Sequence, residues 1–299
     1  MQYVLTMTTD PKQRVLSERH AKTAIAALAA AGASNIGADW LSPNRALDLN
    51  FQGLAPAEAA PAVHAALIDL PTDINAQSAS GRRKQLLIAD MDSTIITNES
   101  LDSLANFIGI RDQVEPITAR AMRGEIDFEA ALQDRVRLFA GHPASLLDRL
   151  LNERIHLTGG AETLVRTMRG NGAFTALVSG GFTFVTEAVA ATVGFHTHRG
   201  NVLLIENGVL TGAVAEPILG KEAKMESLRA FCAERNLVAG QVMAVGDGAN
   251  DIPMLLGAGA GVAFHAKRAV AAAARFKINH GDLTALLYLQ GYHDAELVI

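Results

Sequence analysis

Two aspartates, Asp90 and Asp92, stand one residue apart directly after the apolar run Leu86–Ala89. Such a run predicts a short buried strand. Alternate residues of a strand point the same way, so both carboxylates can reach the space beyond its carboxyl end, where open α/β sheets bind ligands. Paired carboxylates repel each other unless a cation lies between them, and Mg²⁺, which prefers oxygen ligands, is the simplest candidate. The alternative is a strand that runs into an acidic, solvated turn.

A serine and two glycines follow a second predicted strand, Phe174–Val178. Ser179, Gly180 and Gly181 lie between this strand and a predicted helix over Thr183–Val193. Backbone N–H groups, the helix dipole and a hydroxyl together favour an anion at such a junction. Most Ser-Gly-Gly segments are merely turns, so the residues alone leave both interpretations open.

Acidic residues also follow a third predicted strand, Val242–Val245. The next segment is Gly-Asp-Gly-Ala-Asn-Asp, which contains Asp247, Asn250 and Asp251 among glycines that allow a close approach of the backbone. Lys224 precedes this strand, near the start of a predicted helix. A lysine in that position usually faces solvent, but one directed into the site would compensate the charge of a phosphate.

The elements that carry these residues alternate between strands and helices, which predicts an α/β fold with a Rossmann-like parallel sheet and right-handed crossovers. Further strands are predicted over Ala260–Phe264 and Phe276–Ile278, and the pair Asn207-Gly208 indicates a β-hairpin. Residues 98–157 show only helical periodicity. A helical cap inserted there, directly after the first core strand, would cover the strand ends as a lid.

Residues 1–80 predict a small α+β domain before the parallel-sheet domain, residues 81–299, with the polar Gly81–Gln85 at the boundary. The order β-α-β-β-α-β is the ferredoxin-like pattern. No residues of this domain suggest a catalytic site, which leaves a structural or dimerisation module and a small-molecule regulatory site as alternatives. The predicted strands begin at Tyr3, Asn35, Arg45 and Asp73, and the predicted helices span Ser17–Ala31 and Pro56–Leu70.

The composition is that of an ordinary globular protein: 299 residues, 49% hydrophobic and 19% charged, with a net charge of −5 and no long basic run for nucleic acid. No apolar segment reaches the ~18 residues of a membrane span, and the N-terminus lacks the basic region of a signal peptide. We therefore expect a cytoplasmic protein that binds neither membranes nor nucleic acid. The single cysteine, Cys232, cannot form an intramolecular disulfide and is expected to pack.

Four segments, taken in order, resemble the motifs of the haloacid dehalogenase-like phosphatases: Asp90-Met91-Asp92-Ser93-Thr94, Val178-Ser179-Gly180-Gly181, Lys224 and Gly246-Asp247-Gly248-Ala249-Asn250-Asp251. Four pairs in the helical block are similar to the phosphoserine phosphatases in particular: Asn98-Glu99, Ala121-Met122, Asp127-Phe128 and Arg135-Val136. The resemblance covers about residues 86–290. More diffusely, residues 1–80 resemble the amino-acid-binding, ACT-type ferredoxin-like domain that precedes the phosphatase in many bacterial members.

This resemblance implies Mg²⁺-dependent hydrolysis of O-phospho-L-serine to L-serine and phosphate, the last step of serine biosynthesis, through an aspartyl-phosphate. Asp90 would be the nucleophile, and Asp92 the general acid and then the general base. Mg²⁺ would be bound by Asp90, Asp92 and Asp247. The resemblance implies that Asp92 contributes its backbone carbonyl, and coordination through its side chain is the alternative.

The resemblance also implies which residues hold the substrate. Glu99 would bind the ammonium group and Arg135 the carboxylate, although the residues alone would favour a pair of exposed helical charges. Met122 and Phe128 would shield the substrate, with core packing as the alternative. The phosphate oxygens would contact Ser179, Gly180 and Lys224, and Asn250 would orient the phosphate or Lys224.

Other functions stay open at this point. The same chemistry would serve a different small phosphomonoester, or a phosphotransferase that passes the phosphoryl group to a second alcohol. A non-catalytic amino-acid-binding regulator belongs to another class, and the intact pair Asp90 and Asp92 argues against it. A homodimer formed through residues 1–80 is one assembly that the sequence allows.

Overall fold

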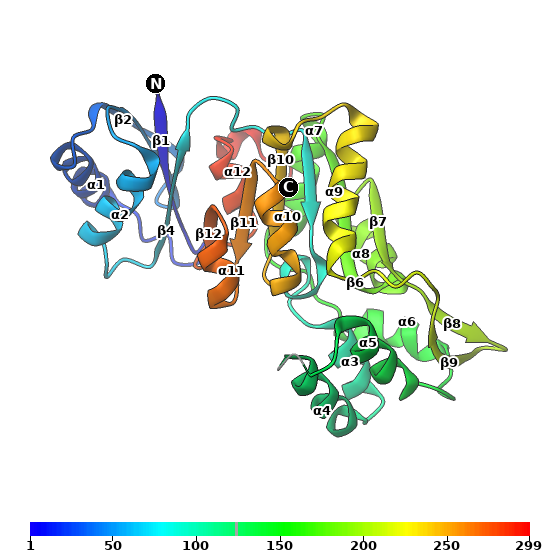
Figure 1. Cartoon of the computed structure of the whole chain (residues 1–299). Helices are drawn as coiled ribbons and strands as arrows, with labels where there is room; N and C mark the ends of the chain where they lie inside the picture. Colours follow the sequence, from blue (N-terminus) through cyan, green and yellow to red (C-terminus); the bar gives the residue numbers. More distant parts are fainter. Residues whose placement is uncertain (123–124) are drawn as a thin grey trace.

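Three β-sheets organise the part of the chain that the structure describes (Figure 1). The computed structural model describes residues 1–122 and 125–299, without the side chains of Met122 and Lys221. Within these ranges, no helix is long and apolar enough to cross a membrane. The predicted α/β fold class is confirmed, because a six-stranded parallel sheet forms the core and a separate four-stranded antiparallel sheet precedes it.

The N-terminal sheet has the predicted β-α-β-β-α-β connectivity, with the strand order β2-β3-β1-β4 and antiparallel neighbours throughout. This is the ferredoxin-like arrangement. Leu5, Met7, Leu47 and Leu49 alternate along two central strands and are fully buried in the cluster that includes the two helices. The elements are β1 (Tyr3–Thr9), α1 (Glu18–Ala30), β2 (Ser34–Ser42), β3 (Ala46–Gln52), α2 (Pro56–Ala66) and β4 (Thr72–Ser78).

The opposite face of this sheet packs on the core domain. Leu41 and Ala46 form a buried cluster with Tyr288, which lies near the C-terminus. Beside them, Arg82 Nη1 lies 2.6 Å from Asp48 Oδ2, and Arg82 also donates to the backbone carbonyl of Tyr288. Both faces of the antiparallel sheet are therefore covered, one by its own helices and the other by the core.

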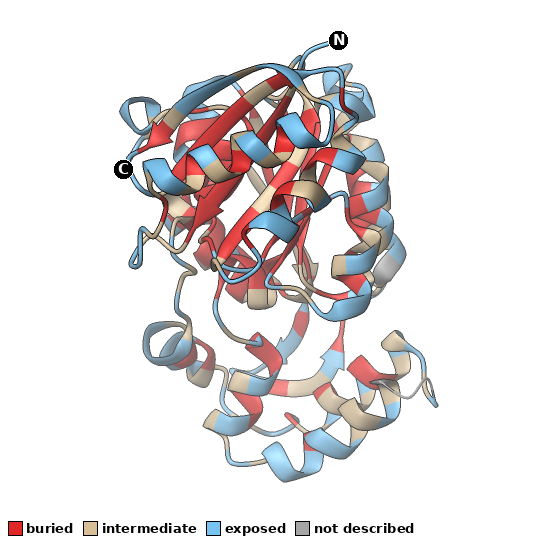
Figure 2. Ribbon diagram, turned by 90° about the vertical axis from the view of Figure 1, so that its left-hand side faces the viewer, coloured by how far each residue is buried: buried red, intermediate tan, exposed pale blue. Residues whose placement is uncertain are grey.

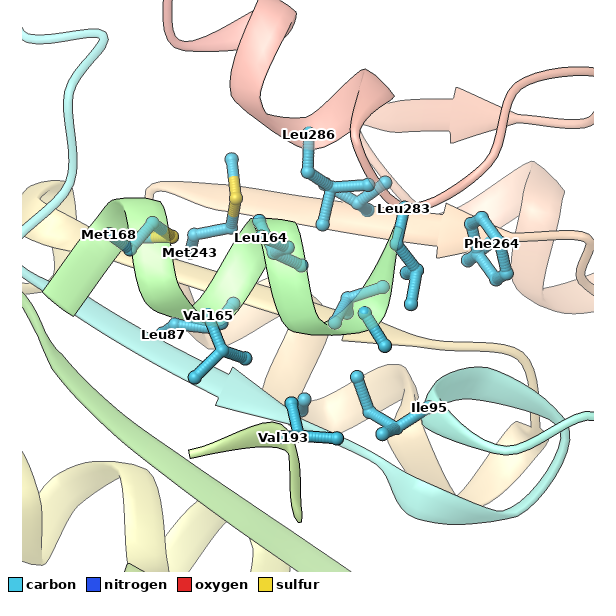
Figure 3. Packing of buried hydrophobic residues seen from close by; sticks show 14 of the residues in the cluster. Leu87, Ile95, Leu164, Val165, Met168, Val193, Met243, Phe264, Leu283 and Leu286 are labelled. Carbon is cyan, nitrogen blue, oxygen red and sulfur yellow. The ribbon is translucent and has the colours of Figure 1, made fainter. Parts of the chain in front are cut away.

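The core sheet has the order β12-β11-β10-β5-β6-β7, with all neighbours parallel. Buried residues of α7, α8 and α12 pack on one face of the sheet, as Figure 3 shows for Leu164, Val193 and Leu286, and α9, α10 and α11 cover the other. The strands are β5 (Leu86–Ala89), β6 (Phe174–Phe182), β7 (Thr197–Asn201), β10 (Val242–Gly246), β11 (Ala260–Phe264) and β12 (Phe276–Ile278). The helices are α7 (Ala161–Gly170), α8 (Thr183–Val193), α9 (Lys221–Arg235), α10 (Ile252–Gly257), α11 (Arg268–Ala273) and α12 (Ala285–Leu289).

Helices between β5 and β6 form a cap that stands apart from both large sheets (Figure 2). A buried apolar cluster joins these helices to a hairpin, β8 (Leu203–Glu206) and β9 (Val209–Val214), through Leu132, Phe139 and Leu210. The hairpin itself was predicted, but its place on the cap was not. The cap helices are α3 (Ser100–Phe107), α4 (Arg111–Met122), α5 (Phe128–Arg137) and α6 (Ser145–Arg154).

Three elements differ from their predictions, including the strand β7 (Thr197–Asn201), which was not predicted. Ser179, Gly180 and Gly181 lie in the extended end of β6, not in a turn, because the strand continues to Phe182 through a register shift. The short helix α12 was not predicted, because all five of its residues are buried and give no amphipathic pattern.

Candidate active site

The first core strand, β5, ends immediately before Asp90, and the backbone is extended at Asp90 and at Asp92. It then turns at Ser93, whose φ of 54° is unusual for a residue other than glycine. The two carboxylates have different partners. Asp92 Oδ1 accepts a hydrogen bond from the backbone N–H of Ser100 at 2.7 Å, whereas Asp90 Oδ1 lies 2.7 Å from Lys224 Nζ.

Lys224 points into the site, so the solvent-facing alternative is wrong. Its side chain is 3% exposed in the first turn of α9, and its Nζ lies 2.5 Å from Asp251 Oδ1 as well as 2.7 Å from Asp90 Oδ1. Burial lowers the pKa of Lys224, but the two carboxylates outweigh it and hold that pKa above its ordinary value. Lys224 is therefore a fixed positive charge beside Asp90.

A third carboxylate joins this cluster because β10 lies beside β5 in the sheet. Single oxygens of Asp90, Asp247 and Asp251 all lie within 4.8 Å of one another. Burial, and then repulsion from Asp251, raises the pKa of Asp247 to about 6. The same two causes raise the pKa of Asp90, against the opposing attraction of Lys224. A cation with a preference for oxygen ligands would relieve this repulsion.

The side chain of Asp92 has hydrogen-bond partners outside the carboxylate cluster. Its Oδ2 accepts a hydrogen bond from Ser179 Oγ at 3.1 Å, in addition to the bond from Ser100. Burial, and then the charge of Glu99, raises the pKa of Asp92 to about 6. A carboxyl group with a pKa near neutrality can both give and take a proton. The cluster of three carboxylates that the structure forms contains Asp251 and not the side chain of Asp92.

The glycine segment of β6 packs tightly against Asp92. The backbone N–H of Gly181 donates to Ser179 Oγ at 2.9 Å, and a Cβ on Gly181 would lie 2.7 Å from Asp92 Oδ2. The side chain of Asn201 donates to the carbonyl of Gly180 at 2.8 Å and accepts, also at 2.8 Å, from the segment that leads into α9. Asn201 therefore holds the glycine segment, a role that the sequence analysis missed.

Glu99 and Arg135 of the cap face the core residues. Glu99 Oε1 accepts a hydrogen bond of 2.8 Å from Ser93 Oγ, which fixes the exposed carboxylate next to the turn after Asp92. Arg135 Nε donates to a backbone carbonyl one turn earlier in α5. Burial lowers the pKa of Arg135, and the carboxylates of Asp102 and Glu99 oppose that effect. The cap thus presents one charge of each sign to the cleft.

A cleft of about 220 Å³ lies between the cap and the core. Lys224 is not at its surface but behind Asp90, and the side chain of Met122 lies outside the described part of the structure. The sequence analysis did not single out Ser100 or Lys267, which also line the cleft. The predicted residues that line it are Asp90, Asp92, Glu99, Phe128, Arg135, Ser179, Gly180, Asp247 and Asn250.

A family model of haloacid dehalogenase-like hydrolases matches residues 87–256. The matched segment is more than half of the chain and contains β5, the cap, β6 and β10. The chain belongs to this family. The family resemblance predicted from the motifs is therefore confirmed, and the match covers every residue that lines the cleft except Lys267.

Curated relatives of this family member are named phosphoserine phosphatases. The one from Lactococcus lactis is 43% identical over 204 residues, which cover 68% of this chain and 94% of that protein. The one from Streptomyces coelicolor is 42% identical over 236 residues, which cover 79% of this chain but 57% of that longer protein. A crystal structure of a probable phosphoserine phosphatase from Vibrio cholerae has a TM-score of 0.79 at 26% identity and covers 97% of this chain and 86% of its own.

Proposed function

We propose that this protein hydrolyses O-phospho-L-serine to L-serine and phosphate, the last step of serine biosynthesis, with Mg²⁺ as cofactor. The observation that carries the proposal is that Glu99 and Arg135 line the same small cleft as Asp90 and Asp92. The ammonium and carboxylate groups of serine need one partner of each sign, and the phosphate needs a nucleophile. The phosphoserine phosphatases that are 42% and 43% identical support the same substrate.

In this proposal Asp90 attacks phosphorus, and an aspartyl-phosphate forms while the serine oxygen leaves. Lys224 Nζ, 2.7 Å from Asp90 Oδ1, favours the ionised form of the nucleophile and offsets the charge of the phosphate. Asp251 positions Lys224 and also accepts a hydrogen bond of 3.0 Å from the backbone N–H of Gly248. The charge that the reaction needs is thus held in place before the substrate arrives.

Asp92 protonates the leaving serine oxygen and then takes a proton from the water that hydrolyses the aspartyl-phosphate. Its raised pKa of about 6 suits both roles near neutral pH. The hydrogen bonds from Ser100 and Ser179 fix the orientation of the Asp92 carboxyl group beside Asp90. Both steps balance, because the proton that Asp92 gives in the first step is restored by the attacking water in the second.

Mg²⁺ fits the donors at this site. Carboxylate oxygens of Asp90, Asp247 and Asp251 converge within 4.8 Å, and oxygen is the ligand that Mg²⁺ prefers. Asp90 and Asp247 would hold the ion together with the backbone carbonyl of Asp92, while Asp251 stays paired with Lys224. When bound, Mg²⁺ supplies positive charge that stabilises the phosphate oxygens.

The remaining predicted residues bind the two ends of the substrate. The Ser179 hydroxyl, the Gly180 N–H and Asn250 contact the phosphate. Phe128 covers the substrate from the cap side, close enough to the core that a Cβ on Gly180 would lie 3.0 Å from its ring. Met122 is proposed to shield the same side.

We assign residues 1–80 to an ACT-type domain and residues 81–299 to the phosphatase domain, with the cap over about 98–157. The ferredoxin-like order of the first sheet supports this division. We further propose a cytoplasmic enzyme that binds no nucleic acid, and a homodimer formed through the N-terminal domain.

The test is release of phosphate from L-phosphoserine in the presence of Mg²⁺, with other small phosphate esters alongside. Fast release from L-phosphoserine alone supports the proposal, and cleavage only of another ester overturns the substrate assignment. Thorough removal of metal by EDTA should stop the reaction, and Mg²⁺ should restore it. Transfer of the phosphoryl group to added homoserine, with little free phosphate, would indicate a phosphotransferase instead.

A further inference from the structure

The N-terminal domain contacts a loop of the core through one buried carboxylate, Asp73. Its two oxygens accept hydrogen bonds from three consecutive backbone N–H groups, those of Asn279, His280 and Gly281, with N···O distances from 2.6 to 3.2 Å. The side chain of Asp73 is buried in β4, while the three donors belong to the segment after β12. One side chain of the first domain therefore fixes three residues of the second.

The loop that Asp73 holds contacts the chain after β11. The backbone N–H of His265 donates to the carbonyl of Ile278 at 2.8 Å, and His265 Nε2 lies 2.9 Å from the carbonyl oxygen of Gly281. A carbonyl oxygen only accepts hydrogen bonds, so Nε2 carries the proton. His265 has a φ of 43°, a left-handed conformation that few residues adopt without support. The bond to Gly281 supplies that support.

The turn at His265 is followed two residues later by Lys267, which lies at the active site. The backbone N–H of Lys267 donates to the carbonyl of Asp247 at 3.3 Å, and Lys267 lines the cleft together with Asp247 and Asn250. The backbone of Asp247 is thus bonded to a segment whose path depends on His265. Hydrogen bonds, joined by the short backbone segment from His265 to Lys267, thus connect the N-terminal sheet to the backbone carbonyl of Asp247.

We infer that Asp73 is a positioning residue for the active site: through Gly281 and His265 it holds Lys267 against the backbone of Asp247. The N-terminal domain then contributes to the geometry of the catalytic cleft without touching the substrate. The inference rests on the proposed function only in taking Asp247 as a residue of the reaction site.

Hydrogen exchange of the whole protein tests this series of contacts directly. Asp73→Asn has nearly the same shape but has one acceptor oxygen for three N–H groups. We expect it to speed exchange of the Lys267 amide by roughly 2- to 30-fold, the range found for residues that couple distant sites. Gln77→Met is the matched control, because Gln77 is on the same strand and its amide donates to the core at the carbonyl of Leu289, away from this loop.

A second variant breaks the same series from the core side. His265→Asn tolerates the left-handed backbone but is too short to reach Gly281. It should speed exchange at Lys267 to a similar extent. Should Asp73→Asn fail to fold, Asp73→Glu, which keeps the charge but misplaces it by one methylene, gives the same comparison. Unchanged exchange at Lys267 in a folded Asp73 variant, or equal acceleration in Gln77→Met, would overturn the inference.

Mg²⁺ titration by calorimetry gives the functional readout. A misplaced Asp247 should weaken Mg²⁺ binding in Asp73→Asn and His265→Asn, while KM for L-phosphoserine at saturating Mg²⁺ stays close to that of the unmodified protein. Gln77→Met should bind Mg²⁺ normally. Exchange at Lys267 does not depend on the substrate. If the protein does not hydrolyse phosphoserine, the proposed function is refuted, and the exchange experiment still decides the role of Asp73.

Discussion

On the core side of the cleft, Asp90, Lys224 and Asp251 form a continuous set of ion pairs, with side-chain exposures of 7%, 3% and 0%. On the cap side, Glu99 is exposed and Arg135 is only partly buried. Asp90 and Asp251 follow neighbouring strands of one sheet, and Lys224 lies on a helix that packs on that sheet. The cap residues belong to helices that join the core partly through the short bridge between Ile96 and Leu157. The core wall, to which we assign the chemistry, is therefore more buried and more ion-paired than the cap wall, to which we assign substrate recognition.

This difference has a physical reason. Charges that stabilise a transition state are effective when they are oriented before the reaction, because reorganising them costs free energy. Groups that recognise a substrate must let it in, so a cap that moves is an advantage on that side. Changes in the core wall should therefore act on kcat, and changes in the cap wall should act on KM.

The largest effect is expected from Asp90→Asn. An amide at this position cannot attack phosphorus, so kcat for L-phosphoserine should fall by roughly 10⁴-fold or more, the scale seen when a nucleophile is removed. Single-turnover assays and circular dichroism would check activity and folding. Asp69→Asn, at an exposed position of the N-terminal domain, should change neither. Substantial turnover by Asp90→Asn would exclude Asp90 as the nucleophile.

Arg135→Ala should raise KM for L-phosphoserine by roughly 10- to 100-fold, because a hydrogen bond between charged groups is worth about 1.5–3 kcal/mol. KM for phosphoethanolamine, which lacks the carboxylate, should change little. Arg137→Ala is the matched control, since Arg137 lies on the same helix but pairs with Asp134 at the surface. Equal increases in KM for both esters would show that Arg135 does not read the carboxylate.

Gly181→Ala tests how tightly the core wall is packed. The added Cβ would lie 2.7 Å from Asp92 Oδ2, so the strand or the carboxylate must move. Overpacking of this kind costs about 1–3 kcal/mol of unfolding free energy, and displacement of Asp92 should lower kcat more than it changes KM. Gly240→Ala, where an added Cβ meets no atom within 4 Å, should be neutral by thermal unfolding. A normal kcat in Gly181→Ala would mean that Asp92 tolerates displacement.

The smallest effect is expected from Glu99→Gln, read as a pH profile. Burial and the charge of Glu99 raise the pKa of Asp92 to about 6. Removing that negative charge makes proton loss easier, so the pKa of Asp92 should fall. The general acid is then lost at lower pH, and the alkaline limb of kcat should move to lower pH. If the alkaline limb of the kcat profile stays in place and only KM rises, Glu99 acts in substrate binding alone.

The sequence was sufficient for the residues that follow buried strands. Asp90, Ser179 and Asp247 come directly after short apolar runs, and parallel strands end at one edge of the sheet, so their proximity followed from the pattern. The orientation of Lys224 did not follow, because a helical position alone does not reveal which neighbours a side chain meets. Its two partners, Asp90 and Asp251, lie in the segments that follow β5 and β10.

Contacts between distant segments were also beyond local patterns. Asn201 and Lys267 act through backbone groups of residues brought near by the fold, and neither lies in a motif. The hairpin was indicated by Asn207-Gly208, but its packing on the cap depends on apolar residues of helices far away in the chain. The motifs were therefore enough to predict the candidate site residues, whereas the contacts that hold those residues in place were found only in the structure.

The antiparallel sheet that is covered on both faces has a consequence for biosynthesis. Its last strand ends at Ser78, whereas Tyr288, which packs beneath Leu41 and Ala46, is translated about two hundred residues later. At ribosomal speeds of 5–20 residues per second, this face, which includes the buried carboxylates of Asp48 and Asp73, stays uncovered on the nascent chain for roughly 10–40 s. The antiparallel sheet therefore lacks the partners of this face until the residues around Tyr288 have been made.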